Sequence, residues 1–189
     1  MILIVRDEDT PTVAAAINAF ADEEGLESVP LESLAQSQNP FDMLGVLAAP
    51  RVLVAMSGEQ VVVTGLASLD IAEPGEWGAS MSSSCDAEVI VVDVADDGLH
   101  VGVFDDGEPE ETITVAWTPG AKADTSALAT LADDDEASAA LEKGISARTV
   151  SDLLAKVLDL LGAASPEKDS VVMLAFHDPL DEEEGADAD

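Results

Sequence analysis

Two Asp-Asp-Gly turns between three aliphatic segments constrain the fold of this chain more than any other feature. The segments span residues 88–95, 99–104 and 112–117, and the turns are Asp96-Asp97-Gly98 and Asp105-Asp106-Gly107. Asp-Gly pairs favour tight hairpin turns because glycine adopts the positive φ that such turns need. Strands joined in series by short turns form an antiparallel β-meander.

Further strands are predicted on both sides of this meander. Residues 51–56 and 60–66 are rich in Val and Leu, and Ser57-Gly58-Glu59 separates them, which indicates a second hairpin. The short aliphatic segment 2–5 and the segment 170–176 are predicted as additional strands.

Helices are predicted near the N-terminus and in the C-terminal third. Thr10 as N-cap and Pro11 at the first helical position begin one helix, which ends near Gly25. Residues 126–132 and 134–143 form one broken helix or two. The clearest helix has an apolar stripe at helical spacing, made of Val150, Leu153, Leu154, Val157, Leu158 and Leu161.

Two segments are predicted as loops because proline, glycine and serine interrupt their patterns. Residues 26–50 contain Pro30, Pro40 and Pro50, with a helical turn considered at 41–47. Residues 68–86 contain Pro74, two glycines and a run of three serines.

Strands and helices in separate runs are typical of the α+β class. The sequence predicts an antiparallel sheet with a β-meander at its centre, packed against helices on one side. Residues 1–177 are expected to form a single domain. Residues 178–189 contain seven Asp or Glu and no Lys or Arg, so they are predicted to be a disordered acidic tail.

The charge balance limits the classes of partner. The chain has 40 Asp and Glu against 7 Lys and Arg, a formal net charge of −33. Such a surface repels nucleic-acid phosphates and anionic lipids, so we expect no direct binding to either. A basic protein is the partner that this charge favours. The lone cysteine and the lack of a long apolar run predict a cytoplasmic protein, and the oligomeric state stays open.

Carboxylates near the meander turns are the candidate metal ligands. They are Asp93, Asp96, Asp97, Asp105 and Asp106. Carboxylate oxygens at turns suit Ca²⁺ or Mg²⁺. Their spacing matches no EF-hand loop, and aspartate is also a common turn residue without any metal.

Other reactive side chains give no catalytic pattern. His100 and His177 could meet if their strands pair, but two histidines and Cys85 are too few for a four-ligand zinc site. Asp86 next to Cys85 raises the pKa expected for the thiol, which disfavours a thiolate nucleophile. The chain has no nucleophile elbow and no glycine-rich phosphate loop, so no catalytic residue and no cofactor is predicted.

Three interpretations of function remain. The first, which we favour, is a non-catalytic binding or accessory protein for a basic partner. The second is an ordinary domain whose acidity reflects a host with high internal salt or an acidic proteome, because lysine is scarce and the acids are spread along the chain. The third is a hydrolase that uses a carboxylate and a divalent cation, so the sequence leaves enzymatic activity uncertain.

Overall fold

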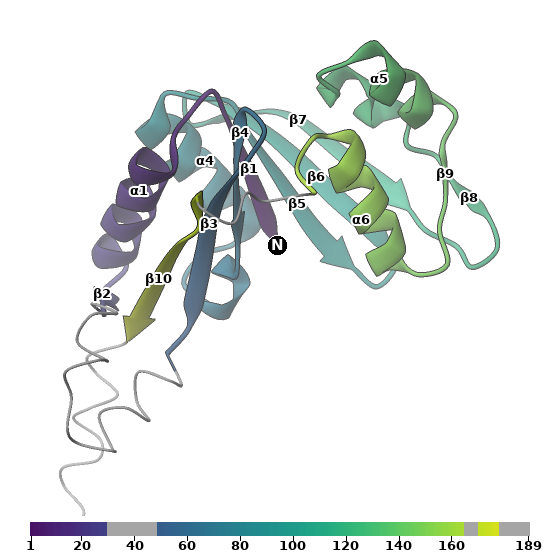
Figure 1. Cartoon of the computed structure of the whole chain (residues 1–189). Coiled ribbons are helices and arrows are strands. Elements are labelled where there is room, and N and C mark those ends of the chain that lie inside the picture. Colours follow the sequence, from purple (N-terminus) through teal and green to yellow (C-terminus); the bar gives the residue numbers. More distant parts are fainter. Residues whose placement is uncertain (30–48, 165–169, 178–189) are drawn as a thin grey trace, which may run out of the picture.

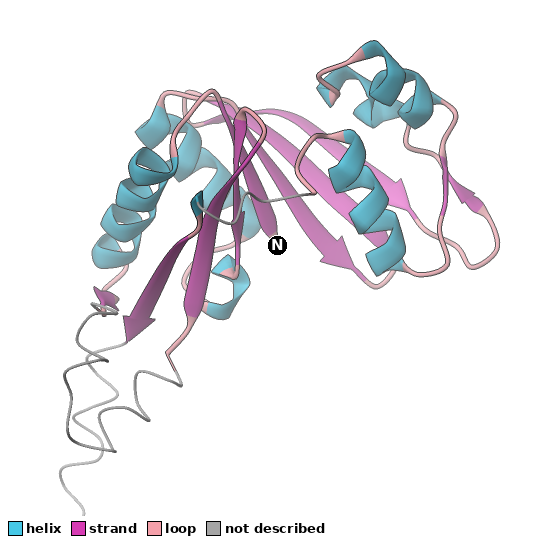
Figure 2. Ribbon diagram, in the orientation of Figure 1, coloured by secondary structure: helices cyan, strands magenta, loops and turns pink. Residues whose placement is uncertain are grey.

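The computed structural model describes residues 1–29, 49–164 and 170–177. Within these residues, the main feature is an eight-stranded sheet with helices packed on it (Figures 1 and 2). The predicted α+β class and antiparallel sheet are confirmed. The acidic tail predicted at 178–189 and the helical turn considered at 41–47 lie outside the described residues.

The strand order in the large sheet is β2-β10-β3-β4-β1-β5-β6-β7, and β8 and β9 form a separate pair. The strands are β1 (Ile2–Arg6), β2 (Glu27–Ser28), β3 (Arg51–Ser57), β4 (Gln60–Thr64), β5 (Val89–Ala95), β6 (Gly98–Asp105), β7 (Glu108–Ala116), β8 (Lys122–Ala123), β9 (Ile145–Ser146) and β10 (Val172–His177). The helices are α1 (Thr10–Glu23), α4 (Pro74–Cys85), α5 (Asp135–Glu142) and α6 (Val150–Leu160), with 3₁₀ turns η1 (Leu66–Ser68) and η2 (Ser126–Leu131).

Both predicted hairpin systems are present, but the meander forms one edge of the sheet rather than its centre, because the other five strands all join on the β5 side. The meander is β5-β6-β7, and its second turn has positive φ at Asp106 (47°) and Gly107 (81°), the geometry that an Asp-Gly turn favours. The β3–β4 hairpin turns at Gly58, whose φ is 63°. β10 returns from the end of the described chain to pair with β3.

Strand β1 shows that both faces of the sheet are buried. Leu3 and Val5 belong to one apolar cluster, which the sheet shares with α1 and α4. Ile4 belongs to a second cluster, shared with η2, α5 and α6. The helices therefore cover both sides of the sheet rather than one (Figure 1). The reason is that β1 carries consecutive aliphatic residues, and these point alternately to the two faces.

The predicted loop over residues 68–86 is wrong for its second half, because α4 occupies Pro74–Cys85. Pro74 lies in the first turn, where its missing N–H has no partner to lose. The Glu76 carboxylate accepts a hydrogen bond from the Glu73 N–H at 2.8 Å and so caps the helix. Trp77, Met81 and Cys85 recur every four residues and are buried on one face.

The small residues of α4 serve close packing rather than a loop. A Cβ atom at Gly78 would lie 2.4 Å from the Phe104 ring, so only glycine lets α4 approach the sheet this closely. Ser82 is fully buried, and its Oγ accepts a hydrogen bond from the Gly107 N–H at 3.0 Å. The glycine and serine content that predicted a loop therefore reflects a tight contact between helix and sheet.

The ends of α1 and α6 follow common capping rules. Asp9, not the predicted Thr10, caps α1: its Oδ1 accepts a hydrogen bond from the Thr12 N–H at 2.8 Å. Thr149 caps α6 by accepting a hydrogen bond from the Asp152 N–H at 3.0 Å. The predicted apolar stripe of α6 is confirmed, with Leu153 and Val157 fully buried.

The two glycines of α4 provide a matched test of this packing. Gly78→Ala should lower the free energy of unfolding by about 1–3 kcal/mol, because the new methyl group overlaps the Phe104 ring. Gly75→Ala should leave stability unchanged or raise it by up to about 1 kcal/mol, because nothing lies within 4 Å of its Cβ position. Urea unfolding measures both, and equal effects would contradict the close contact.

Candidate functional site

Arg6 connects three parts of the fold at one end of the sheet. Its Nη1 lies 2.8 Å from Glu88 Oε1, and its Nη2 lies 3.2 Å from Asp133 Oδ1. Its guanidinium also donates a hydrogen bond to the Leu131 carbonyl. The Arg6 side chain is 23% exposed and that of Glu88 is 34% exposed, so this contact is partly shielded from water. Arg6 thus holds the end of β1 to the start of β5 and to the segment between η2 and α5.

Two further polar contacts join the C-terminal helices to the same end of the sheet. The Gln60 side-chain amide donates a hydrogen bond to Asp133. Ser57 Oγ donates to the Gly162 carbonyl at 2.8 Å, just after α6. These contacts help to fix the orientation of the C-terminal helices on the sheet. Apolar packing alone does not do this, because hydrogen bonds depend on angle whereas apolar burial does not.

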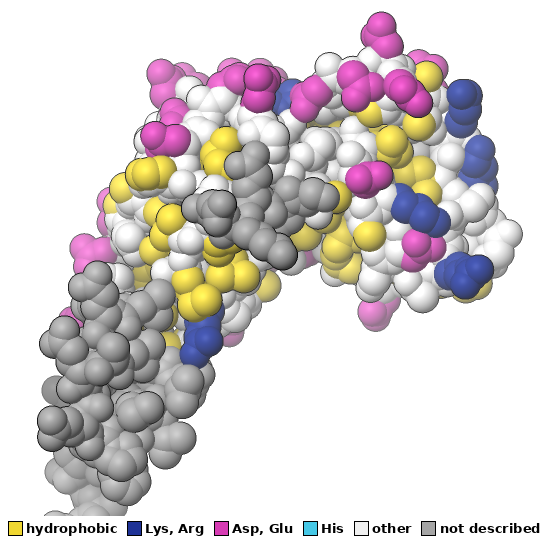
Figure 3. Space-filling view, viewed as in Figure 1, with side chains coloured by type: hydrophobic (Ala, Val, Ile, Leu, Met, Phe, Trp, Pro, Cys, Tyr) yellow, Lys and Arg dark blue, Asp and Glu magenta, His cyan; other side chains and the backbone are white. Residues whose placement is uncertain are grey.

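Four turns lie at this end of the sheet: the turn after β1, the β3–β4 turn, the turn before β5 and the β6–β7 turn. The register pairs Arg6 with Gln60, Val5 with Val89, and Val89 with Phe104, so the ends of these strands are neighbours. The turns bring together a set of carboxylates that we name the acidic rim: Asp7, Glu8, Asp9, Glu59, Asp86, Glu88, Asp105, Asp106 and Glu108. Figure 3 shows acidic side chains along this upper margin of the molecule. Among the described residues of these turns, Arg6 is the only Lys or Arg, and its guanidinium is already bound.

Three rim aspartates occupy left-handed backbone positions. The φ angles are 56° at Asp7, 52° at Asp86 and 47° at Asp106. Glycine adopts this region with less strain than any residue that has a Cβ, although aspartate tolerates it better than most. The rim therefore keeps carboxylates at positions where the backbone alone would favour glycine.

The structure separates the candidate metal ligands predicted from the sequence. Asp96 and Asp97 lie in the β5–β6 turn, whereas Asp105 and Asp106 lie in the β6–β7 turn at the opposite end of β6. Asp93 Oδ1 lies 3.5 Å from the amino group of Met1. In the described ranges, no three His, Cys, Asp or Glu side chains come together in a way that could hold a metal ion.

The strands that carry the two histidines are not neighbours. In the sheet order, β3, β4, β1 and β5 separate β10, which contains His177, from β6, which contains His100. The two strands therefore do not pair. His100 is exposed, and its Nδ1 lies 3.3 Å from Thr114 Oγ1.

Cys85 is a buried thiol at the end of α4. It is 5% exposed and forms no disulfide. Burial raises the pKa of the thiol, and the negative charge of Glu8 raises it further. The direction agrees with the sequence-based expectation, but the causes are burial and Glu8 rather than the adjacent Asp86. A thiol kept neutral in this way is a poor nucleophile.

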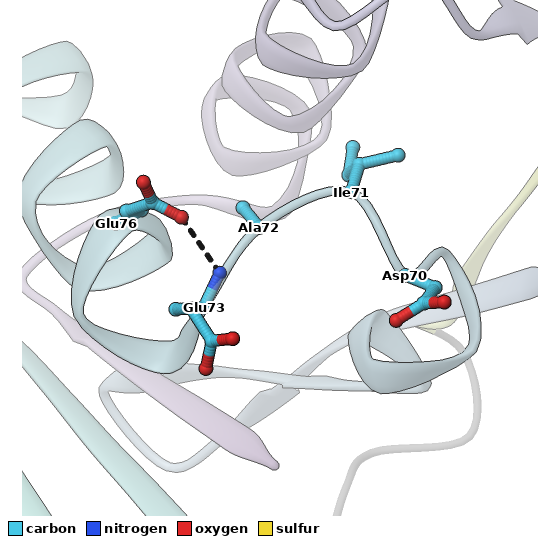
Figure 4. A pocket seen from close by; sticks show the side chains of 5 residues that line it. All are labelled: Asp70, Ile71, Ala72, Glu73 and Glu76. Atoms are coloured by element: carbon cyan, nitrogen blue, oxygen red, sulfur yellow. Dashed lines mark hydrogen bonds between the residues drawn. The ribbon is translucent and has the colours of Figure 1, made fainter.

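A small hollow lies beside the start of α4 (Figure 4). Its volume is about 230 Å³, and it is lined by Asp70, Ile71, Ala72, Glu73 and Glu76. Ligand pockets usually reach roughly 300–1,000 Å³ and have mostly apolar walls. The Glu76 carboxylate is already engaged in capping α4. The hollow is therefore smaller than a usual ligand pocket, and carboxylates rather than apolar side chains make up most of its lining.

Hydrogen bonding to nearby groups lowers the pKa of three exposed carboxyl groups. The Thr12 N–H lowers the pKa of Asp9, Ser126 lowers that of Asp124, and the Arg148 N–H lowers that of Asp152. A general acid at neutral pH needs a carboxyl group whose pKa is raised. These three groups therefore act as caps of turns and helices.

Replacement of Arg6 tests its role in joining the elements. Arg6→Met should lower the free energy of unfolding by about 2 kcal/mol, because Glu88 loses its ion-pair partner and the Leu131 carbonyl loses a hydrogen bond from a charged group. Arg6→Lys should lower the free energy of unfolding by a smaller amount, because lysine keeps the positive charge. Some stability should still be lost, because an ammonium group cannot contact several acceptors at once as the planar guanidinium does. Urea titration measures both variants, and an unchanged stability for Arg6→Met would show that the contact is dispensable.

The burial of Cys85 predicts slow thiol chemistry. In the native protein a disulfide reagent should react about tenfold or more slowly than in the urea-unfolded chain, because access is blocked and the pKa is raised. The unfolded thiol loses its proton first as pH rises. Cys85 should therefore contribute a decrease in the free energy of unfolding above about pH 8.5, and Cys85→Ala should remove it. Equal reaction rates would contradict the burial.

Comparisons with known proteins leave the rim as the principal functional clue. In the described part of the chain, no helix has the length and apolar character needed to cross a membrane. The chain matches no protein-family model, no curated protein and no solved structure.

Proposed function

We propose that the protein is a non-catalytic binding or accessory protein that docks a basic protein partner on the acidic rim. The observation that supports this is the gathering of carboxylates from four separate turns at one end of the sheet. Clustered charges of one sign create a field that attracts and orients an oppositely charged partner. We place this function in the cytoplasm because Cys85 is a free thiol, which suits a reducing compartment.

The energetics require several rim carboxylates to act together. A single exposed ion pair contributes only about 0.2–1 kcal/mol, so one aspartate cannot hold a partner. The turn that contains Asp105 and Asp106 lies next to Glu108, and all three side chains are exposed. Such a group can sum several small attractions and accelerate encounter at low salt. The same field disfavours nucleic acid and anionic membranes.

A second interpretation is that the acidity serves solvation in a high-salt host. Acids outside the rim favour it, such as the exposed Glu110 and Glu111 on β7 and Asp135 in the first turn of α5. In that case the rim carboxylates have no special role, and their removal affects binding no more than removal of acids elsewhere. The two interpretations therefore differ in whether the position of a carboxylate changes its effect on binding.

The two Asp-Asp-Gly turns of the meander allow a matched test of position. With a short oligolysine peptide as probe, Asp105→Asn/Asp106→Asn should weaken binding about fivefold at low salt, at about 0.5 kcal/mol for each lost charge. Asp96→Asn/Asp97→Asn removes the same charge from the opposite end of β6 and should weaken binding by less than about twofold. Isothermal titration calorimetry measures both affinities.

Equal weakening by the two double variants would contradict a docking site on the rim and favour the solvation interpretation. Molar KCl serves as a control, because screening should remove most of the difference between the variants. Asparagine also tolerates the left-handed backbone at residue 106, so the rim variant should keep its fold.

A further inference from the structure

Among the residues that the structure describes, the outer edge of β10 is only partly paired. β10 pairs with β3 over Val172–Ala175, whereas β2 pairs only with Phe176 and His177. The Val29 N–H donates to the Ala175 carbonyl at 2.7 Å on the outer side. Backbone groups alternate in direction along a strand, so the N–H and C=O of Met173 also point outward. Among the described residues, no strand pairs with this edge at Met173.

Apolar side chains are exposed next to this edge. Leu53 and Met173 are each 38% exposed, and Val171 is 45% exposed. Leu53 and Met173 are direct partners in the β3–β10 register, so they share one face of the sheet. Their neighbours Val52 and Val54 point into the core on the α1 and α4 side, so this face is the opposite one. Figure 3 shows hydrophobic side chains gathered over β3 and β10.

The other edge of the sheet is protected against pairing. Strand β7 carries Glu108, Glu110 and Glu111, and Pro109 removes a backbone donor. The register shifts between Val103 and Phe104, which leaves Glu110 as a bulge. Charges, proline and bulges are the usual means of preventing edge-to-edge association. β10 has no charged residue and no proline, so it lacks these protections.

The charge distribution indicates what covers this edge. A basic partner would favour an acid-lined surface, but neither β3 nor β10 contains an Asp or Glu. A chain with a formal net charge of −33 can approach a copy of itself closely only where acids are absent. We propose that β10 pairs edge to edge with β10 of a second copy and forms a two-fold symmetric dimer. This proposal is independent of docking at the rim.

The free length of the edge sets the register of this pairing. β2 and Val29 occupy the edge from Ala175 onward, and the backbone groups of Val171 and Met173 face outward by the same alternation, so an antiparallel pair centres on Val172. Met173 of each copy then lies opposite Val171 of the other, and the contact is self-complementary. The two copies of Val172 form a non-hydrogen-bonded pair with Cα atoms about 4.5 Å apart, within the range of a disulfide.

The first experiment measures the mass of the full chain by sedimentation equilibrium from low to molar KCl. We expect a dimer that tightens with salt, because screening reduces the repulsion between copies. Met173→Lys should raise the dimer dissociation constant by about tenfold or more, since it puts like charges near each other at the new strand pair. Thr112→Lys adds the same charge to exposed β7 and should leave the dimer intact. A monomer at every salt concentration, or a dimer that survives Met173→Lys, would overturn the proposal.

A crosslinking variant tests the register even if Met173→Lys fails to fold. Val172→Cys should form an intermolecular disulfide under mild oxidation, whereas Thr112→Cys should not. The native Cys85 is buried and does not compete. Absence of the crosslink in Val172→Cys, or equal crosslinking of both variants, would overturn the proposed pairing. A monomer with a Met173 amide protected from hydrogen exchange would also do so, and would show that the same chain covers the edge.

Discussion

The burial of an aliphatic sheet on both faces is the constraint on which the rest of this structure depends. In β1, Leu3 and Val5 contact one helical layer and Ile4 contacts the other, and all three are fully buried. Each such side chain contributes roughly 1.5–3 kcal/mol on burial, more than a typical exposed ion pair. Because the buried parts of the two faces cannot accept an unpaired charge, most carboxylates of the described residues lie at strand ends, edges and outer helix faces. Asp93 within β5 is an exception, and it lies 3.5 Å from the amino group of Met1.

This confinement explains the acidic rim without requiring a function for it. The turns are the parts of the sheet that meet water, and aspartate suits their backbone geometry. Turn geometry does not explain the excess of negative over positive charge at the rim. Arg6 is bound between Glu88 and Asp133 and leaves the neighbouring turn carboxylates without a counterion from the described residues of the rim. The proposed basic partner would supply that counterion.

Local patterns in the sequence were sufficient for the elements that depend on local chemistry. The meander follows from its Asp-Gly turns, and α6 follows from apolar spacing. α4 was missed because Gly78 and the serines resemble a loop, and their role becomes visible only against Phe104 of β6. A periodic reading of Trp77, Met81 and Cys85 was the available signal for this helix.

The rim itself could not be predicted, because it depends on strand order. β4 lies between β3 and β1, and β10 joins from the far end of the described chain. Only this non-local pairing places the β3–β4 turn beside Asp7, and Asp7 near Glu88. The β6–β7 turn lies near Glu88 through the predicted meander alone. The ion pair of Arg6 with Asp133 likewise joins residues that are far apart in the sequence. The sequence showed which turns are acidic, but not which turns are neighbours.

The measurement that tests this account most directly is urea unfolding of the full chain as a function of KCl concentration. If burial on both faces outweighs charge repulsion, the protein should unfold cooperatively at low salt, and molar KCl should add only about a few kcal/mol to its stability. The acidic surface is then free to serve a partner. A chain that shows no cooperative transition until KCl approaches molar concentration would contradict this balance and would indicate that the acidity is an adaptation to salt.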